Sequence, residues 1–127
     1  MKRQRMSGRV LQATIIELAH MYGWFAAHFT SVLATGRDGQ PRYRTPVSAD
    51  GKGFPDLVLV RPGDRVIFVE VKGDGDKLRL DQEQWISWLN TAGSEVYVWT
   101  PAHLDSGEIA TTLQEHRPAR ATGFRGW

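Results

Sequence analysis

Cysteine is absent from this chain of 127 residues, which excludes disulfides and thiolate metal sites and fits a reducing compartment. Long hydrophobic runs are absent too, because the longest fall far below the roughly 20 residues of a membrane span. The basic N-terminus, Met1–Arg5, is not followed by the apolar stretch of a signal peptide. We therefore expect a cytoplasmic protein without membrane contact, with one domain and one core over residues 1–127.

Lysine and arginine are missing from residues 80–116, which carry six acidic side chains and a charge of −6. The net charge of the whole chain is +2, so the remainder carries +8. This segregation suits a protein with one surface that binds phosphates and another that faces solvent. Ordinary solubilising charge explains the pattern equally well.

Apolar periodicity predicts an α/β domain with its elements in the order α-β-β-β-α-β. The expected elements are a helix over residues 10–21, a strand over 24–33, a hairpin over 56–72, a helix over 81–92, a strand over 95–100 and a short helix over 104–114. Residues 36–53 are expected to form an eighteen-residue loop, a length that is usually functional or disordered. Residues 1–8 are expected to form a flexible basic arm, and residues 117–127 a loosely held basic tail.

The strongest signal is the hairpin, in which two β-branched, apolar segments flank a Pro-Gly-Asp turn. If it is symmetric about Gly63, Asp56 lies opposite Glu70 with Cβ atoms roughly 5 Å apart. Lys72 then lies on the same face, two residues further on. Like charges in that position are destabilising unless a hard divalent cation bridges them, so the pattern favours a metal-dependent hydrolase. The structural alternative is that Asp56 is a strand-edge or turn residue and that Glu70 and Lys72 form a solvent-facing pair.

Other polar residues are candidates for supporting roles. Arg42, Arg44 and Lys52 in the long loop suit phosphate contact better than chemistry. His28 shares a strand face with Ala26 and is a candidate for the cleft, although a lone histidine in a strand is more often structural.

A set of short motifs follows one another along the chain with a characteristic spacing. They are Gly53-Phe-Pro-Asp-Leu57, Val69-Glu-Val-Lys72, Gln82, Trp85, Ala92-Gly93 and Val96-Tyr-Val-Trp99. In this order the chain resembles the PD-(D/E)xK nuclease superfamily, and specifically its small stand-alone VRR-Nuc domains, over about residues 10–104. The resemblance implies a restriction-endonuclease-like core, with a mixed central sheet of about four strands flanked by helices.

The resemblance also implies roles for individual residues. Asp56 and Glu70 would be metal ligands, joined by the backbone carbonyl of Val71. Lys72 would orient or help to deprotonate the attacking water and stabilise charge on the phosphate. Gln82 would support the active-site strand or the metal-bound water network, although a simple role in the first turn of its helix is equally credible. Oxygen ligands without thiolate favour Mg²⁺ or Mn²⁺ over zinc.

One position departs from the family pattern, in which the first helix usually supplies an additional glutamate. Glu17 is the only acidic residue of the predicted first helix, and it lies on the less apolar face. Gln12 shares a stripe with Ile15 and Ile16 and so faces the core. We therefore favour Gln12, as a group that supports the metal ligands without binding the metal itself, over Glu17 as a ligand.

By resemblance, the expected activity is a metal-dependent endonuclease that acts on branched, flapped or four-way-junction DNA. The implied setting is replication and repair in a bacterial or phage-infected cell, as for a Holliday junction resolvase. Stand-alone members of the family look like dimers, which implies a homodimer here, and the Trp-rich second helix is a candidate interface. Two alternatives stay open: an accessory module that binds DNA without cutting it, and a nuclease that acts on RNA or nucleotides.

Overall fold

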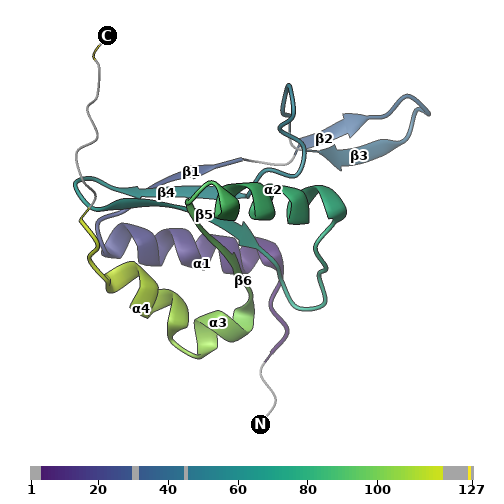
Figure 1. Cartoon of the computed structure of the whole chain (residues 1–127). Coiled ribbons are helices and arrows are strands. Elements are labelled where there is room, and N and C mark those ends of the chain that lie inside the picture. Colours follow the sequence, from purple (N-terminus) through teal and green to yellow (C-terminus); the bar gives the residue numbers. More distant parts are fainter. Residues whose placement is uncertain (1–3, 30–31, 45, 119–125, 127) are drawn as a thin grey trace.

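The structure, a computed structural model, describes residues 4–29, 32–44, 46–118 and 126. Its central sheet has four strands in the order β1 (Phe25–His28), β4 (Leu57–Arg61), β5 (Arg65–Val71) and β6 (Glu95–Trp99). Strand β4 runs antiparallel to both β1 and β5, whereas β6 is parallel to β5. Helices flank this mixed sheet (Figure 1), which confirms the predicted α/β, restriction-endonuclease-like core.

The register of the predicted hairpin is confirmed, with Val58 opposite Phe68 and Val60 opposite Val66. Because side chains alternate along a strand, this register sends the odd-numbered residues of β4 and β5 to one face of the sheet. The even-numbered residues, including Asp56 and Glu70, therefore belong to the other face.

Helix α1 (Gly8–Met21) covers the odd-numbered face. Ser7 caps the helix, since its side chain accepts a hydrogen bond from the Val10 amide at 3.2 Å. One stripe of α1 is fully buried in the core with the sheet and helix α4 (Glu108–Gln114); the core includes Leu11, Ile15, Ala19, Leu57, Leu59, Ile67, Val69, Ile109 and Leu113. No helix in the described part of the chain is long and apolar enough to cross a membrane.

Helix α2 (Leu80–Thr91) lies on the even-numbered face, and aromatic rings join it to the sheet. The ring of Phe54 meets those of Phe68 and Trp85 edge to face, with centroids 5.9 and 5.1 Å apart. Such pairs add stability beyond the burial of their area. The segment that precedes β4 is thereby fixed between the sheet and α2.

The prediction of a single strand over residues 24–33 was wrong. The chain leaves the central sheet after β1 and starts a separate hairpin, in which β2 (Val32–Thr35) pairs with β3 (Pro41–Arg44). This hairpin projects from the body of the molecule (Figure 1). The predicted loop over residues 36–53 thus contains a strand, which gave no signal because its four residues, Pro-Arg-Tyr-Arg, are all exposed and lack apolar alternation.

The predicted short helix over residues 104–114 is two helices, α3 (Pro101–Asp105) and α4. Gly107 separates them in a left-handed conformation with φ 82°, which ends one helix before the next begins. Part of the predicted tail, residues 119–125 and 127, lies outside the described residues.

The predicted basic arm is shorter than residues 1–8. The Met6 amide donates to the carboxylate of Asp74 at 2.9 Å, and the Arg5 guanidinium donates to the Asp74 carbonyl at 3.2 Å. These bonds hold the segment before α1 against the loop that follows β5. Residues 1–3 lie outside the described residues.

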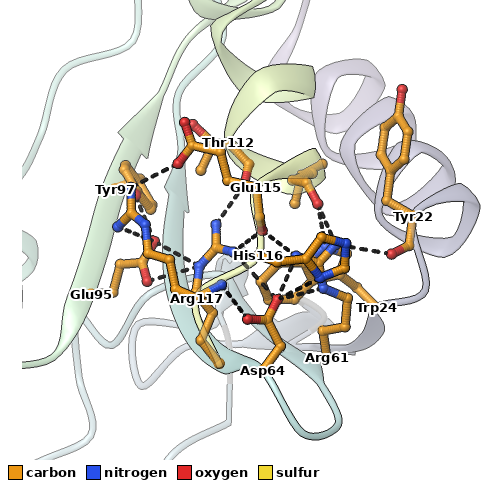
Figure 2. Close-up of polar contacts among 12 residues, drawn as sticks. Tyr22, Trp24, Arg61, Asp64, Glu95, Tyr97, Thr112, Glu115, His116 and Arg117 are labelled. Atoms are coloured by element: carbon orange, nitrogen blue, oxygen red, sulfur yellow. Dashed lines mark hydrogen bonds and ion pairs between the residues drawn. The ribbon is translucent and has the colours of Figure 1, made fainter. Parts of the chain in front are cut away.

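A buried polar network attaches the C-terminal segment to the β4–β5 turn (Figure 2). Arg61 is only 8% exposed and donates to the Asp64 carboxylate at 2.6 Å and to the Leu113 carbonyl at 2.7 Å. Arg65 donates to the Glu95 carboxylate at 3.0 Å. Both guanidinium groups lie against the ring of Trp24, at 4.7 and 4.9 Å from its centroid.

This network lies at the opposite end of β4 and β5 from Asp56 and Glu70. The carbonyls of Thr112 and Glu115 accept hydrogen bonds from the same two arginines, so α4 ends on the hairpin turn. The network stabilises the fold by joining the C-terminal segment to the β4–β5 turn. The other end of the hairpin remains free for chemistry.

Candidate active site

A cleft of about 300 Å³ opens where the chain enters β4. Asp56 and Gln82 line it, together with three cationic side chains, those of Arg44, Lys52 and Arg79. The β2–β3 hairpin, the segment before β4 and the start of α2 each contribute to its walls. It is thus a polar cleft in which the Asp56 carboxylate lies among cations.

Two carboxylates meet at this end of the sheet. One oxygen of Asp56 accepts a hydrogen bond from the Val71 amide at 2.8 Å, which ties the start of β4 to the end of β5. Glu70 is 1% exposed, and its Oε1 lies 3.1 Å from Gln82 Nε2 and 3.5 Å from Lys72 Nζ. An amide and an ammonium group therefore converge on one buried carboxylate oxygen.

The other oxygen of Glu70, Oε2, is buried and has no hydrogen-bond partner among the described residues. Burial raises the pKa of Glu70 to about 8, and the charge of Asp56 adds to the rise while Lys72 opposes it. An unpartnered buried carboxylate oxygen is costly, and a cation at this point would remove the cost.

The residues present fit a hard divalent ion. Mg²⁺ keeps several waters and is usually held by one or two carboxylates, which Asp56 and Glu70 supply. Among the described residues no group of three His, Cys, Asp or Glu side chains could hold a metal. The remaining protein ligand would be a backbone carbonyl, and that of Val71 follows Glu70 directly in the chain. No side chain at the site offers sulfur or imidazole, so zinc does not suit it.

Gln82 is fixed from both ends of its side-chain amide. Its Nε2 donates to Glu70, and its Oε1 accepts from the Arg79 amide at 2.9 Å, which caps the first turn of α2. The amide orientation follows from these two bonds, because the carboxylate accepts and the backbone amide donates. Helix α2 thus holds Glu70 in place.

The family comparison adds a match to this geometry: residues 42–102 match the VRR-NUC domain. The chain contains a VRR-NUC domain. No curated protein and no solved structure gives a significant match to the chain. The matched stretch runs from β3 to the start of α3 and includes Asp56, Glu70, Lys72 and Gln82, so the cleft belongs to a nuclease-family domain.

Of the DNA-contact candidates, Arg44 and Lys52 line the cleft of the VRR-NUC domain. Arg42 does not line it and instead pairs with Asp38 in the hairpin loop. Gln12 and His28 contact each other through side-chain nitrogens, and neither lines the cleft. Both lie outside the matched stretch.

Five cleft residues escaped the sequence analysis: Phe29, Tyr43, Val47, Gly51 and Arg79. Arg79 had a usable signal, because it lies two residues before the predicted second helix and follows the Glu-Val-Lys strand closely. Tyr43 gave none, since the strand that carries it was not recognised. Phe29 lies within the predicted strand over residues 24–33, where nothing in the sequence distinguishes it from its neighbours.

Gly53 fixes the wall of the cleft against α2. Its φ is +90°, and a Cβ there would lie 2.5 Å from the backbone carbon and oxygen of Asp81. Trp85 Nε1 strengthens the same contact by donating to the Asp50 carbonyl at 3.0 Å. Only glycine allows the two backbones to approach so closely.

We expect Gly53→Ala to lower the free energy of unfolding by about 3 kcal/mol or more, because left-handed strain and backbone overlap add together. The matched control is Gly39→Ala, where φ is +79° and a Cβ meets nothing within 4 Å. This control should lose only about 1 kcal/mol, from strain alone. Urea unfolding of both variants measures the difference, and equal losses would show that the Gly53 contact does not matter.

Proposed function

We propose that this chain is a divalent-metal-dependent endonuclease that hydrolyses DNA phosphodiester bonds in the cytoplasm, during replication or repair. The observation that carries the proposal is the buried, unpartnered oxygen of Glu70, a residue that pairs with Lys72. It lies behind a cleft that Asp56 and Gln82 line together with three cations. The family supports the nuclease class. The metal, the DNA and the structure preference are our inference from the site.

Asp56, Glu70 and the Val71 carbonyl would hold Mg²⁺ or Mn²⁺. When bound, such an ion polarises a phosphoryl oxygen and lowers the pKa of a bound water. Gln82 keeps Glu70 oriented through its hydrogen bond of 3.1 Å. Lys72, whose Nζ lies 3.5 Å from Glu70, would position the attacking water or take its proton and stabilise charge on the phosphate.

Arg44, Lys52 and Arg79 would bind the phosphates on either side of the bond that is cut. All three line the cleft that contains Asp56, and Arg44 and Lys52 have no acidic partner among the described residues. Such contacts release counterions from DNA, so binding should weaken steeply as salt rises.

A preference for branched or flapped DNA and a homodimer complete the proposal. Phe25, Val60 and Val66 are exposed neighbours across three strands, and Trp88 on α2 is exposed as well. A second copy would cover such apolar surface and bring two sites together. Sedimentation velocity tests this directly, since a monomer at all concentrations would reject the dimer.

The experiment for the function is cleavage of a labelled panel of single-stranded, duplex, flap and four-way-junction DNA. The purified protein is incubated with Mg²⁺, Mn²⁺ or EDTA. We expect cutting only with metal, and fastest on a branched or flapped member of the panel.

Cutting in EDTA would overturn the metal dependence. A folded protein that binds the panel but cuts none of it with either metal would overturn the enzyme and leave a DNA-binding accessory module. Matched RNA substrates in the same panel decide whether the enzyme cuts DNA or RNA.

A further inference from the structure

Tyr43 is an exposed aromatic side chain at the mouth of the cleft. It lies on β3, is 69% exposed, and lines the same cleft as Asp56 and the cations. Its neighbour across the hairpin is Leu33, which is also exposed. The projecting hairpin therefore presents an apolar surface next to a site built for phosphate.

Phe29 is a second aromatic wall of the cleft, and it is held firmly. Its amide donates to the backbone carbonyl of Asp56 at 3.1 Å, which fixes its backbone beside that of Asp56. Its ring meets Phe54 edge to face at 5.5 Å, and Phe54 in turn meets Trp85 on α2. A chain of aromatic contacts thus anchors this wall to the body of the protein.

Cations and open aromatic rings together suit a nucleotide with its base exposed. The cations attract the phosphate, while a ring accepts a base of any sequence on its face. Bases in a duplex are already stacked on one another and offer only their edges. At about 300 Å³ the cleft lies at the small end of ligand pockets, which suits one nucleotide rather than a paired duplex.

We propose that this cleft binds an unpaired nucleotide whose base stacks on Tyr43, with Phe29 as the second apolar wall. The inference rests on the proposed function and sharpens it: the enzyme selects DNA that exposes a base next to the phosphate that is cut. Arg44 follows Tyr43 directly in β3 and also lines the cleft, so one short strand offers both the ring and a phosphate contact.

The test uses DNA with 2-aminopurine at one position, which is either unpaired in a gap or paired in a duplex. Binding is followed in EDTA, so that no cutting occurs and stacking is read by quenching of the fluorescence. The variants are Tyr43→Ala and Tyr43→Phe. Met21→Ala is the matched control, because Met21 is an equally exposed large apolar residue, at 72%, that lines neither the cleft nor the proposed dimer surface.

We expect the wild type to quench the unpaired base, and Tyr43→Ala to weaken binding of gapped DNA by about 5- to 150-fold. Tyr43→Phe and Met21→Ala should bind gapped DNA as the wild type does, and binding of intact duplex should change little in any variant. Equal quenching by Tyr43→Ala and wild type, or an equal loss on gapped and paired DNA, would overturn the stacking site.

Cleavage of the gapped DNA by the wild type with Mg²⁺ separates this inference from the proposed function. Cutting without quenching overturns the nucleotide site and leaves the endonuclease standing. Quenching that depends on Tyr43, without cutting, supports the site and contradicts the endonuclease.

Discussion

Asp56→Asn should reduce metal-dependent cleavage of DNA at least about a thousandfold. The variant removes one of the two carboxylate charges at the site while keeping an oxygen that accepts from the Val71 amide. A catalytic ion supplies several kcal/mol of transition-state stabilisation, and each factor of ten in rate corresponds to about 1.4 kcal/mol. The measurement is the single-turnover rate with Mg²⁺ on the best substrate of the panel.

Asp50→Asn is the matched control for this loss. Asp50 is an exposed acid a few residues before Asp56, and its contact with Trp85 uses the backbone carbonyl, which the substitution keeps. We expect this variant to cut at nearly the wild-type rate. If the two variants lose the same activity, the effect comes from general charge near the cleft and the assignment of Asp56 is wrong.

Asp64→Ala should lower the free energy of unfolding by about 3–5 kcal/mol, because it leaves two buried guanidinium groups without their shared carboxylate. Asp64 is 5% exposed and pairs with Arg61, as Figure 2 shows. It also pairs with Arg65. Urea unfolding followed by tryptophan fluorescence measures the change. The signal sums over the five tryptophans of the chain and therefore follows unfolding of the whole domain.

Glu115→Ala is the control, because it removes an exposed ion pair with Arg117 but keeps the Glu115 carbonyl that Arg61 and Arg65 bind. Its stability should stay close to that of the wild type. A wild-type stability for Asp64→Ala would show that the network does not hold the fold together.

Acid should weaken the same network. Burial alone would raise the pKa of Asp64, but the hydrogen bonds from Arg61 and the Arg117 amide, with the charges of Arg61 and Arg65, outweigh it and hold the pKa below its usual 3.8. A carboxyl with a lowered pKa contributes stability above that value and loses it as pH falls through the folded-state pKa. The contribution of Asp64 is therefore complete near neutral pH.

The part of the fold that the sequence predicted is the part with strong periodicity. The hairpin of β4 and β5 is symmetric around a Pro-Gly-Asp turn, so its register followed from counting residues from Gly63. The helical stripe of α1 followed from spacing in the same way, whereas the support of the active-site strand by Gln82 was implied by the family resemblance. Local sequence patterns determine such elements, because the apolar residues of each element recur on one of its faces.

The missed features depend on contacts that local patterns do not encode. Strand β3 is polar and exposed on every residue, so nothing distinguishes it from a loop until it pairs with β2. Arg61 and Arg65 were ordinary charges on strand ends in the sequence, and only the return of α4 to the hairpin turn buries them. Tyr43 became a site candidate once the hairpin placed it in the cleft.

Binding of Mn²⁺ to the metal-free protein tests the carboxylate site most directly. Titration calorimetry would compare the wild type with Glu70→Gln and with the control Asp50→Asn. Burial already disfavours the charged form of Glu70, so a neutral amide in Glu70→Gln should not weaken the fold. We predict that the wild type and Asp50→Asn bind Mn²⁺ alike and that Glu70→Gln loses the binding. Equal binding by Glu70→Gln and wild type would place the metal elsewhere and contradict the proposed site.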